Sequence, residues 1–306
     1  MNSFMARLDE NQDTVFNDYI EIFYSNREAH LKLNAFLTKK NITEKNISPY
    51  FASYKLVEIT PTIVIKWQNE IISKELDDGY NYSNAMLKTI HTQLSAVFNH
   101  AIRYYGLRQN PTKVVGRMGK PEREILFWTT DEYKRFIVKI MDKPVNFCAF
   151  EVLYWYGIRL GKLLALMRSD FDLKKNKLRI NKSIQKIHEK DIVSSPKTVN
   201  TYRTIDISKF LADEMYTYFK SLYRLKDDDR VFPITKSYFH HELNRESKAA
   251  RVKHIRIHDL RHSHVSLLIE KGFSVLVIAE KVGHESIRIT YKYIYFHRKE
   301  LKLRIH

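Results

Sequence analysis

The chain has one cysteine, Cys148, among its 306 residues, which excludes an internal disulfide framework. Its apolar surroundings, Phe147-Cys148-Ala149-Phe150, favour a small core residue of an intracellular protein. The sequence also lacks an uninterrupted run of about 18 apolar residues, a charged and apolar leader at its start, and any repeat or low-complexity tract. These absences predict a cytoplasmic protein without a membrane partner.

Acidic residues are few beside the basic ones. There are 35 Asp and Glu against 52 Lys and Arg, a formal net charge of +17 and a pI near 9.6. Counted along the chain, about +3 falls on residues 1–120 and about +14 on the remainder. Such an excess attracts polyanions, of which nucleic acid is the commonest. The alternative is that the basic residues only keep the protein soluble. Binding to a membrane surface fits less well, because the basic residues are dispersed and not gathered on one amphipathic helix.

The hydrophobic content of 44% and the aromatic content of 13% exclude a disordered protein. The length suits two domains. We predict a frayed start at 1–13, a helical bundle at 14–107, a basic linker at 108–127 and a second domain at 128–306. Apolar periodicity and end signals predict the helices of the bundle at 14–25, 26–40, 60–76 and 83–106, with a short extended run at 54–59.

The second domain mixes helical and strand signals. Helices are expected at 144–156 and 160–166, and from Thr130, Leu211 and Lys236. Short strand-like runs at 177–180, 191–193 and 203–207 predict a three-stranded antiparallel sheet. The fold class expected is therefore mainly α with a small antiparallel sheet, α+β.

Residues suited to phosphate chemistry gather near the end of the chain. His258 and Arg261 stand three apart, so on a helix they share a face and can converge on one anion. Arginine offers a fork of donors matched to two phosphate oxygens, and histidine can move a proton near neutral pH. His284 follows Gly283, and Tyr293 comes nine residues later. Taken singly, each of these is more often a surface or packing residue.

Upstream, two basic residues have unusual settings. Arg159 follows Gly157-Ile158 with apolar residues on both sides, a costly place for a charge unless an anion meets it. Lys197, in Pro196-Lys197-Thr198, lies in a polar turn between two predicted strands.

His258, His262 and His264 are also possible ligands of a zinc ion. The first two stand four apart, as a zinc pair can. However, the sequence has no HExxH motif and no carboxylate ligand at a fixed spacing, so His262 and His264 are interpreted as helix-packing residues or as supports of the site. No metal and no cofactor are predicted.

These pieces together, Gly157-Ile158-Arg159, Pro196-Lys197-Thr198, His258-x-x-Arg261, Gly283-His284 and Tyr293, resemble the tyrosine recombinases, the integrases of phages and conjugative elements. The order and spacing of five motifs over some 140 residues are specific. The resemblance extends to the helical bundle, which is similar to the core-binding (SAM-like) domain of that family.

The resemblance implies that Tyr293 attacks the scissile phosphate to give a 3′-phosphotyrosyl link and a free 5′-hydroxyl. Arg159 and Arg261 would hold the non-bridging oxygens and stabilise the charge of the transition state. The spacing from Gly283-His284 favours Tyr293 over Tyr291 and Tyr295, with Tyr291 the main rival.

The resemblance further implies that Lys197 protonates the leaving 5′-oxygen and that His258 is the general acid or base for the tyrosine. His284 would donate a hydrogen bond to the phosphate. Because the bond energy is conserved in the phosphotyrosyl link, neither a nucleotide-binding loop nor a metal is required.

The same resemblance implies a C-shaped clamp on double-stranded attachment or core sites. Base contacts are expected from the helices at 81–105 and 235–249, and the apolar tail after Tyr293 is expected to dock on a neighbouring protomer of a homotetramer. The further partners expected are an excisionase or a DNA-bending protein, and the location is the cytoplasm, at the nucleoid.

The chain departs from the family pattern at Lys162, where family members have an acid three residues after the first arginine. Many integrases of this family have a separate arm-site DNA-binding domain before the bundle, but only about thirteen residues precede it here. We therefore expect either a two-domain integrase or a truncated piece of a larger one. The alternatives are a type IB topoisomerase or telomere resolvase, a catalytically weakened recombinase that only binds DNA, and a metal-dependent nuclease.

Overall fold

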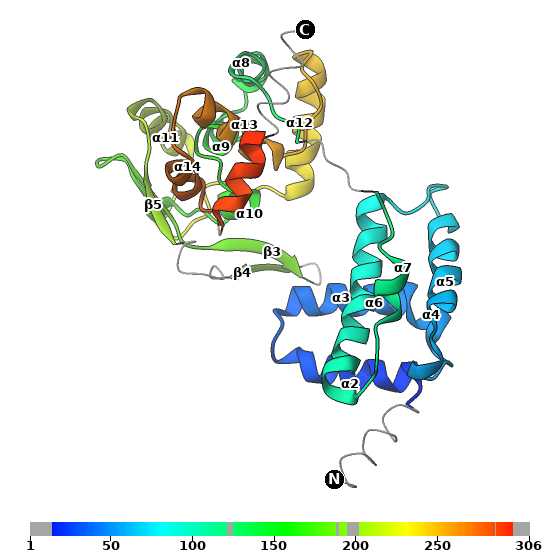
Figure 1. Cartoon of the computed structure of the whole chain (residues 1–306). Coiled ribbons are helices and arrows are strands. Elements are labelled where there is room, and N and C mark those ends of the chain that lie inside the picture. The colour runs from blue at the N-terminus through cyan, green and yellow to red at the C-terminus, as the bar shows by residue number, and fades with distance from the viewer. Residues whose placement is uncertain (1–13, 121–124, 188–189, 195–201, 285, 296–306) are drawn as a thin grey trace. The chain divides into compact units, whose positions relative to one another are not determined.

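The structure, a computed structural model, describes residues 14–120, 125–187, 190–194, 202–284 and 286–295. The chain divides into two compact units, Met1–Arg123 and Glu124–His306 (Figure 1). Helices dominate both, and the antiparallel strands belong to the second, so the predicted fold class is confirmed. No helix in the described part of the chain is long and apolar enough to cross a membrane.

The first unit is a helical bundle. Its longest helix, α6, begins where Ser83 Oγ accepts a hydrogen bond from the backbone N–H of Met86 and ends at Gly106, whose φ of +72° is left-handed. Both ends agree with the sequence prediction. The helices of this unit are α2 (Phe16–Glu28), α3 (Leu33–Asn46), α4 (Ser48–Phe51), α5 (Pro61–Ser73), α6 (Asn84–Tyr105) and α7 (Pro111–Val115), with a 3₁₀ turn, η1, at Leu56–Glu58.

The helix predicted at 26–40 is wrong at both ends, because α2 continues past its start and α3 runs on to Asn46. Two of the polar residues after Lys40, Thr43 and Asn46, are buried and bonded to other parts of the bundle, which keeps this segment helical. Thr43 Oγ1 lies 2.6 Å from Tyr24 Oη, and Asn46 Oδ1 accepts a 2.6 Å hydrogen bond from Tyr82. The extended run predicted at 54–59 is also wrong, since it contains the η1 turn.

Part of the segment predicted as a linker packs into the first unit. α7 contacts α5 and α6. The buried Asn110 donates to Ser95 O at 3.1 Å, and Met118 is only 2% exposed.

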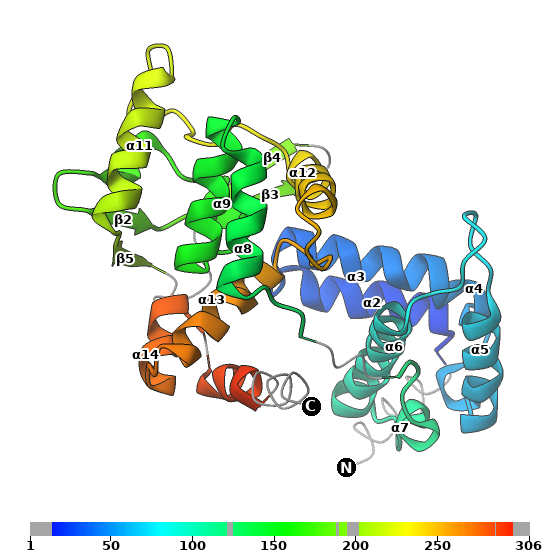
Figure 2. The same ribbon diagram turned by 90° about the horizontal axis from the view of Figure 1, so that it is seen from above.

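The second unit is organised around α9 (Pro144–Tyr156), which packs against α8 (Thr130–Ile137), α11 (Lys209–Ser221) and α13 (Asp259–Glu270) (Figure 2). Neighbours on several sides explain why α9 is apolar almost all round. The other helices described in the second unit are α10 (Leu160–Leu163), α12 (Lys236–Ala249), α14 (Val275–Val282), a helical segment at 287–295, and the 3₁₀ turns η2 (Val138–Ile140) and η3 (Arg168–Asp170). The helix predicted at 160–166 is therefore too long by a turn.

The strands form two separate sheets, whereas the sequence predicted a single three-stranded sheet that included the run at 191–193. The run at 191–193 belongs to a hairpin with the strand just before it and not to the three-stranded sheet, because chain neighbours pair most readily. The three-stranded sheet has the order β1-β2-β5, and both of its ladders are antiparallel. The strands are β1 (Phe171–Asp172), β2 (Lys177–Ile180), β3 (Ser183–Ile187), β4 (Lys190–Ser194) and β5 (Arg203–Asp206).

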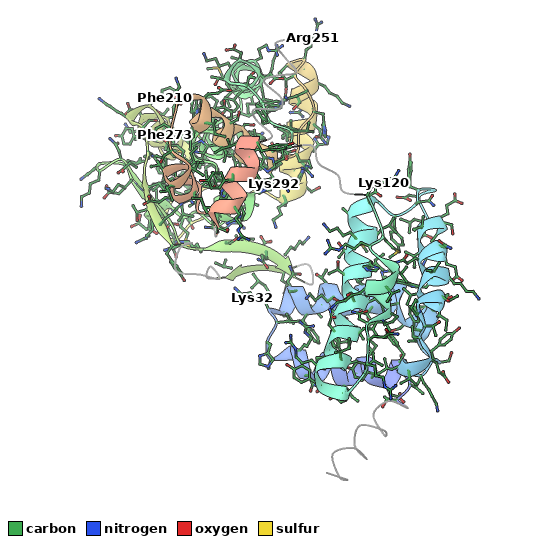
Figure 3. The ribbon with its side chains drawn as sticks, in the orientation of Figure 1. Lys32, Lys120, Phe210, Arg251, Phe273 and Lys292 are labelled. Atoms are coloured by element: carbon green, nitrogen blue, oxygen red, sulfur yellow. The ribbon has the colours of Figure 1, made fainter. Side chains whose placement is uncertain are left out.

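The surface of the second unit carries aromatic side chains as well as charges. Phe210, at the start of α11, is 58% exposed and Phe273, just before α14, is 43% exposed (Figure 3).

Candidate active site

A tight turn after α9 places Arg159. Gly157 has a left-handed φ of +56°, and a Cβ at this position would lie 2.8 Å from His264 Cδ2, so glycine is needed for both conformation and space. Gly157 O accepts a 2.7 Å hydrogen bond from Arg261 Nη1. The turn thus binds the end of α9 to α13, and Arg159 follows as the N-cap of α10.

Arg261 is a buried cation with donors to spare. It is 3% exposed, and its Nη2 has no hydrogen-bond partner among the residues that the structure describes. Burial, then the positive charges of Arg159 and Arg203, lowers the pKa of Arg261 to about 9. An unpaired buried guanidinium is expensive, so this arrangement is suited to binding an anion.

Aromatic rings gather around Tyr293, in the helical segment that Lys292 marks in Figure 3. The ring of His284 is stacked on Tyr293, with centroids 5.4 Å apart and an interplanar angle of 12°. His262 lies on another side of the phenol at 4.9 Å, and His258 meets His262 edge-on at 5.1 Å. Three histidines and one tyrosine thus form a continuous set of ring contacts.

His284 is positioned by the end of α14 and by Thr290. Gly283 ends α14 in a left-handed conformation, φ +67°. His284 Nδ1 lies 2.8 Å from Oγ1 of the fully buried Thr290, which leaves Nε2 for another partner. Desolvation, then the charges of Arg261 and Arg159, lowers the pKa of His284 to about 3, so its ring is neutral at pH 7.

The three tyrosines of this segment have different surroundings. Tyr291 and Tyr295 are 56% and 66% exposed, whereas Tyr293 is partly buried between the histidines. Desolvation raises the pKa of Tyr293, and the positive charges of Arg261 and Arg159 oppose that rise. Of the three phenols, Tyr293 has both the histidines and the arginines beside it.

His258 stands at the N-cap of α13 and remains exposed at the surface. Desolvation of part of its ring, followed by the charges of His262 and Arg261, lowers its pKa to about 4, so it is neutral at pH 7 and able to accept a proton. Asp259 is fully buried and accepts hydrogen bonds from the side chain of Arg256, while its Oδ1 lies 3.2 Å from His262 Nδ1. The hydrogen bonds from Arg256 fix the start of α13.

The structure therefore brings together most of the predicted site. Ring contacts, for His258 by way of His262, and mutual electrostatic effects connect five of the six predicted residues. The sixth, Lys197, lies outside the described residues. The five connected residues are Arg159, His258, Arg261, His284 and Tyr293.

Sequence reasoning did not single out Arg203. Arg203 opens β5, and its buried Nε has no acceptor within the described part of the chain. The available signal was strand alternation, because Arg203 and Ile205 are partly buried while Thr204 and Asp206 are exposed. His262, interpreted as a packing or supporting residue, contacts the ring of Tyr293, which agrees with a supporting role.

Lys162, noted in the sequence as a departure, is 6% exposed. Desolvation, then Arg203, Arg159 and Arg261, lowers its pKa to about 8. In residues 14–120, 125–187, 190–194, 202–284 and 286–295, no group of three or more His, Cys, Asp or Glu is arranged to hold a metal ion.

The sequence matches two family models. Residues 127–300 match the model described as phage integrase family, and residues 15–72 match its N-terminal SAM-like domain. Among curated proteins, the ICEBs1 integrase of Bacillus subtilis is 29% identical over 298 residues, 93% of this chain and 79% of that protein. The integrase of Mycobacterium phage L5 is 24% identical over 82% of this chain and 67% of that protein.

Solved structures show the same fold. The Tn1549 transposon integrase in complex with a circular intermediate DNA has a TM-score of 0.74 at 16% identity, covering 94% of this chain and 98% of that one. A lambda integrase dimer bound to a COC′ core site has a TM-score of 0.67 at 18% identity, covering 95% of this chain and 80% of that one.

Proposed function

The chain belongs to the phage integrase family of tyrosine recombinases, which makes it a site-specific DNA recombinase of mobile elements, and we propose that Tyr293 is its nucleophile. One observation carries the proposal. Tyr293 stacks on His284 beside Arg159 and Arg261, and the buried Arg261 has no hydrogen-bond partner for its Nη2 among the residues that the structure describes.

In the proposed step, Tyr293 Oη attacks the phosphorus of a DNA phosphodiester. The new P–Oη bond forms as the P–O5′ bond breaks, giving a 3′-phosphotyrosyl link and a free 5′-hydroxyl. The phenol loses its proton and the 5′-oxygen gains one. Attack by the 5′-hydroxyl of a partner strand reverses the exchange, so joining needs no external energy.

The arginines would bind the non-bridging oxygens. A phosphodiester carries one negative charge, and a second develops in the pentacoordinate transition state, so fixed cations stabilise the transition state more than the substrate. Arg261 Nη1 donates to Gly157 O, whereas Nη2 has no partner in the described part of the chain and would bind a phosphate oxygen. Arg159, at the start of α10, is the second half of the clamp.

The histidines would handle the phenol proton and orient the phosphate. His258 and His284 are neutral at pH 7, so a neutral imidazole is available as a base. His262 lies between His258 and Tyr293 and would link the two rings. His284 would donate through Nε2 to the phosphate, since Thr290 occupies Nδ1. Lys197 is the proposed acid for the 5′-oxygen.

Double-stranded DNA is the proposed partner, and phosphate contacts would supply most of the affinity. The relatives and structural neighbours include integrases bound to DNA as dimers and tetramers, which supports a multimeric assembly here, proposed as a homotetramer. Polar residues on the exposed faces of α6 and α12 are candidates for contacts to bases. They are Lys88, Thr92, Asn99 and Arg103 on α6, and His241, Asn244 and Lys248 on α12. An excisionase or bending protein, and a location at the nucleoid, belong to the same proposal.

The test is covalent trapping on DNA. A pool of short duplexes with randomised sequence and a nick is incubated with the protein in EDTA, and protein–DNA adducts are isolated under denaturing conditions and sequenced. We expect an adduct that forms with the wild-type protein and with Tyr291→Phe but not with Tyr293→Phe. An adduct that survives in Tyr293→Phe and is lost in Tyr291→Phe would show that Tyr291 is the nucleophile. No adduct with any duplex in the pool would favour a protein that only binds DNA.

A further inference from the structure

One arginine beside the proposed reaction centre has no part in the proposed step. Arg203 begins β5, and its pairing with Ile180 of β2 places both side chains on the same face of the sheet. Ile180 is fully buried, and Ile205, two residues after Arg203 on that face, packs against the core of the second unit. Arg203 therefore lies at the end of an apolar sheet face, where a charge is costly unless an anion meets it.

The guanidinium of Arg203 has an unsatisfied donor. Its Nε is buried and has no acceptor among the residues that the structure describes. The buried carboxylate of Asp170 is bound by Lys182 at 2.7 Å and by Arg179 at 3.3 Å. A buried N–H without an acceptor destabilises the free protein, so this position favours a ligand that supplies an oxygen.

Electrostatic effects connect Arg203 with the residues that are proposed to hold the phosphate. Burial, and then the positive charge of Arg159, lowers the pKa of Arg203 to about 10. Arg203 is in turn one of the charges that, after burial, lower the pKa of Arg261 and of His284. An anion held by Arg159, Arg261 and His284 would therefore lie within the field of Arg203 as well.

We propose that Arg203 is a third arginine of the phosphate site and donates through Nε to a non-bridging oxygen of the scissile phosphate. The assignment rests on the proposed function, which brings that phosphate to Arg159 and Arg261. A phosphodiester has one negative charge, its pentacoordinate transition state has two, and each non-bridging oxygen can accept more than one hydrogen bond. A third fixed donor therefore stabilises the transition state more than the substrate.

The kinetic test removes the oxygen that Arg203 would bind. A nicked duplex recovered from the trapped pool is made with phosphate at the cleavage position, and again with methylphosphonate, in which a methyl group replaces one non-bridging oxygen. The two methylphosphonate diastereomers are separated, one for each oxygen. The variants are Arg203→Gln and Arg203→Lys, the second of which keeps the charge without the planar fork. Arg179→Gln is the control, because Arg179 lies on β2 of the same sheet and has its own partner, Asp170.

We expect Arg203→Gln to slow adduct formation on the phosphate duplex by about 10- to 100-fold, since it removes one donor to a developing oxyanion. On the diastereomer that lacks the oxygen bound by Arg203, the same substitution should change the rate little. Arg203→Lys should show this pattern with a smaller effect, and Arg179→Gln should react as the wild-type protein does. A purely structural role would slow the reaction of all three duplexes equally. That result, or an unchanged rate on the phosphate duplex, would overturn the proposal.

An equilibrium measurement tests Arg203 without any reaction. Thymidine 3′-phosphate, which is mostly a dianion at pH 8, and its monoanionic methyl ester are titrated separately into the full chain at low salt. The wild-type protein should bind the dianion about tenfold more tightly than the ester, because charge-assisted hydrogen bonds strengthen with the charge of the acceptor. Arg203→Gln should lose most of that preference, and Arg179→Gln should keep it. Equal binding of both ligands by the wild-type protein, or a preference that survives in Arg203→Gln, would overturn the proposal.

The proposed function and the role of Arg203 fail separately. If the preference for the dianion depends on Arg203 but no adduct forms on any duplex, the nucleophile assignment fails and Arg203 remains a phosphate-binding residue. If adducts form on Tyr293 and the preference is the same in Arg203→Gln as in the wild-type protein, only the role of Arg203 fails.

Discussion

Two clusters of charged side chains lie in the second unit, and their balance of charge differs. Between α9 and α12, Lys143 and Arg245 face Glu242 and Glu246 at 2.8–3.2 Å, so two cations meet two carboxylates. In the candidate active site, Arg159, Arg203 and Arg261 form no salt bridge with a carboxylate of the described residues. These three residues are called the arginine cluster. The charges of the first cluster are matched within the folded chain, whereas the arginine cluster is suited to binding an anion from outside it.

The difference separates charges that hold the fold together from charges that act on a ligand. In the α9–α12 cluster each charge is matched within the chain, so removing one leaves its partners unmatched. In the arginine cluster the positive charges repel one another, so removing one relieves repulsion in the free protein while it weakens the binding of a phosphate. Stability and activity should therefore respond in opposite ways to substitutions in the two clusters.

The largest effect is expected for Arg261→Gln. It removes a donor to the developing charge of the transition state, so the rate of adduct formation on nicked DNA should fall by about 10²–10³-fold. The substitution removes one hydrogen bond to Gly157 O, but it also removes a buried charge that no carboxylate of the described residues matches, so the unfolding temperature should change little. Arg224→Gln, at an exposed position after α11, is the matched control and should leave both quantities unchanged. A variant that is unstable yet reacts at the wild-type rate would break the distinction between the clusters.

A smaller effect, on stability alone, is expected for Glu242→Gln. Glu242 is 2% exposed and accepts from Lys143, Arg245 and Asn146. Losing its charge should cost about 2 kcal/mol of unfolding free energy, measured by urea denaturation. The rate of adduct formation, measured where the variant is folded, should stay the same. A loss of activity without a loss of stability would place this cluster in the reaction.

The third effect concerns His264, whose protonation should make the stability of the fold depend on pH. Its side chain packs against Gly157, and the residue is 6% exposed. Desolvation, then Arg261 and Arg203, lowers its pKa from 6.5 to about 3. The folded-state pKa lies below the unfolded one, so the unfolded chain takes up the proton first. The contribution of the neutral ring is complete above about pH 6.5 and is lost as the pH falls toward 3.

In this window His264 should contribute up to about 1.4 kcal/mol of unfolding free energy per pH unit. His264→Gln should reduce the slope of stability against pH between 6.5 and 4, measured by denaturant titration at a series of pH values. His240→Gln, at an exposed position on α12, should leave the slope as it is. An unchanged slope in His264→Gln would mean that this histidine is charged in the folded state.

The sequence was most informative where local chemistry decides the structure. Ser83 and Gly106 mark the ends of α6, and Thr129 caps α8 by accepting from the backbone N–H of Glu132, because capping needs only neighbouring residues. The motifs around Arg159, His258, His284 and Tyr293 were found from their spacing within a known family pattern.

Prediction failed where tertiary packing decides. The polar end of α3 is helical because Tyr24, on α2, and Tyr82, in the loop before α6, bond to its side chains, which no local pattern reveals. The run at 191–193 pairs with its chain neighbour instead of the larger sheet. Arg203 carries no motif, and its importance comes only from its place beside Arg159 and Arg261.

The most direct test of the central claim is to identify the residue that carries DNA after the reaction. Trypsin cleaves after Arg288 and Lys292, so Tyr291 leaves in the peptide Ile289-Thr290-Tyr291-Lys292, while Tyr293 and Tyr295 leave in the peptide that follows. The trapped adduct is digested with nuclease and trypsin, and the modified peptide is fragmented in a mass spectrometer. We expect the nucleotide on the second peptide, at Tyr293. A nucleotide on Tyr291, on Tyr295 or outside this segment would contradict the account, because only Tyr293 lies beside both His284 and the two arginines.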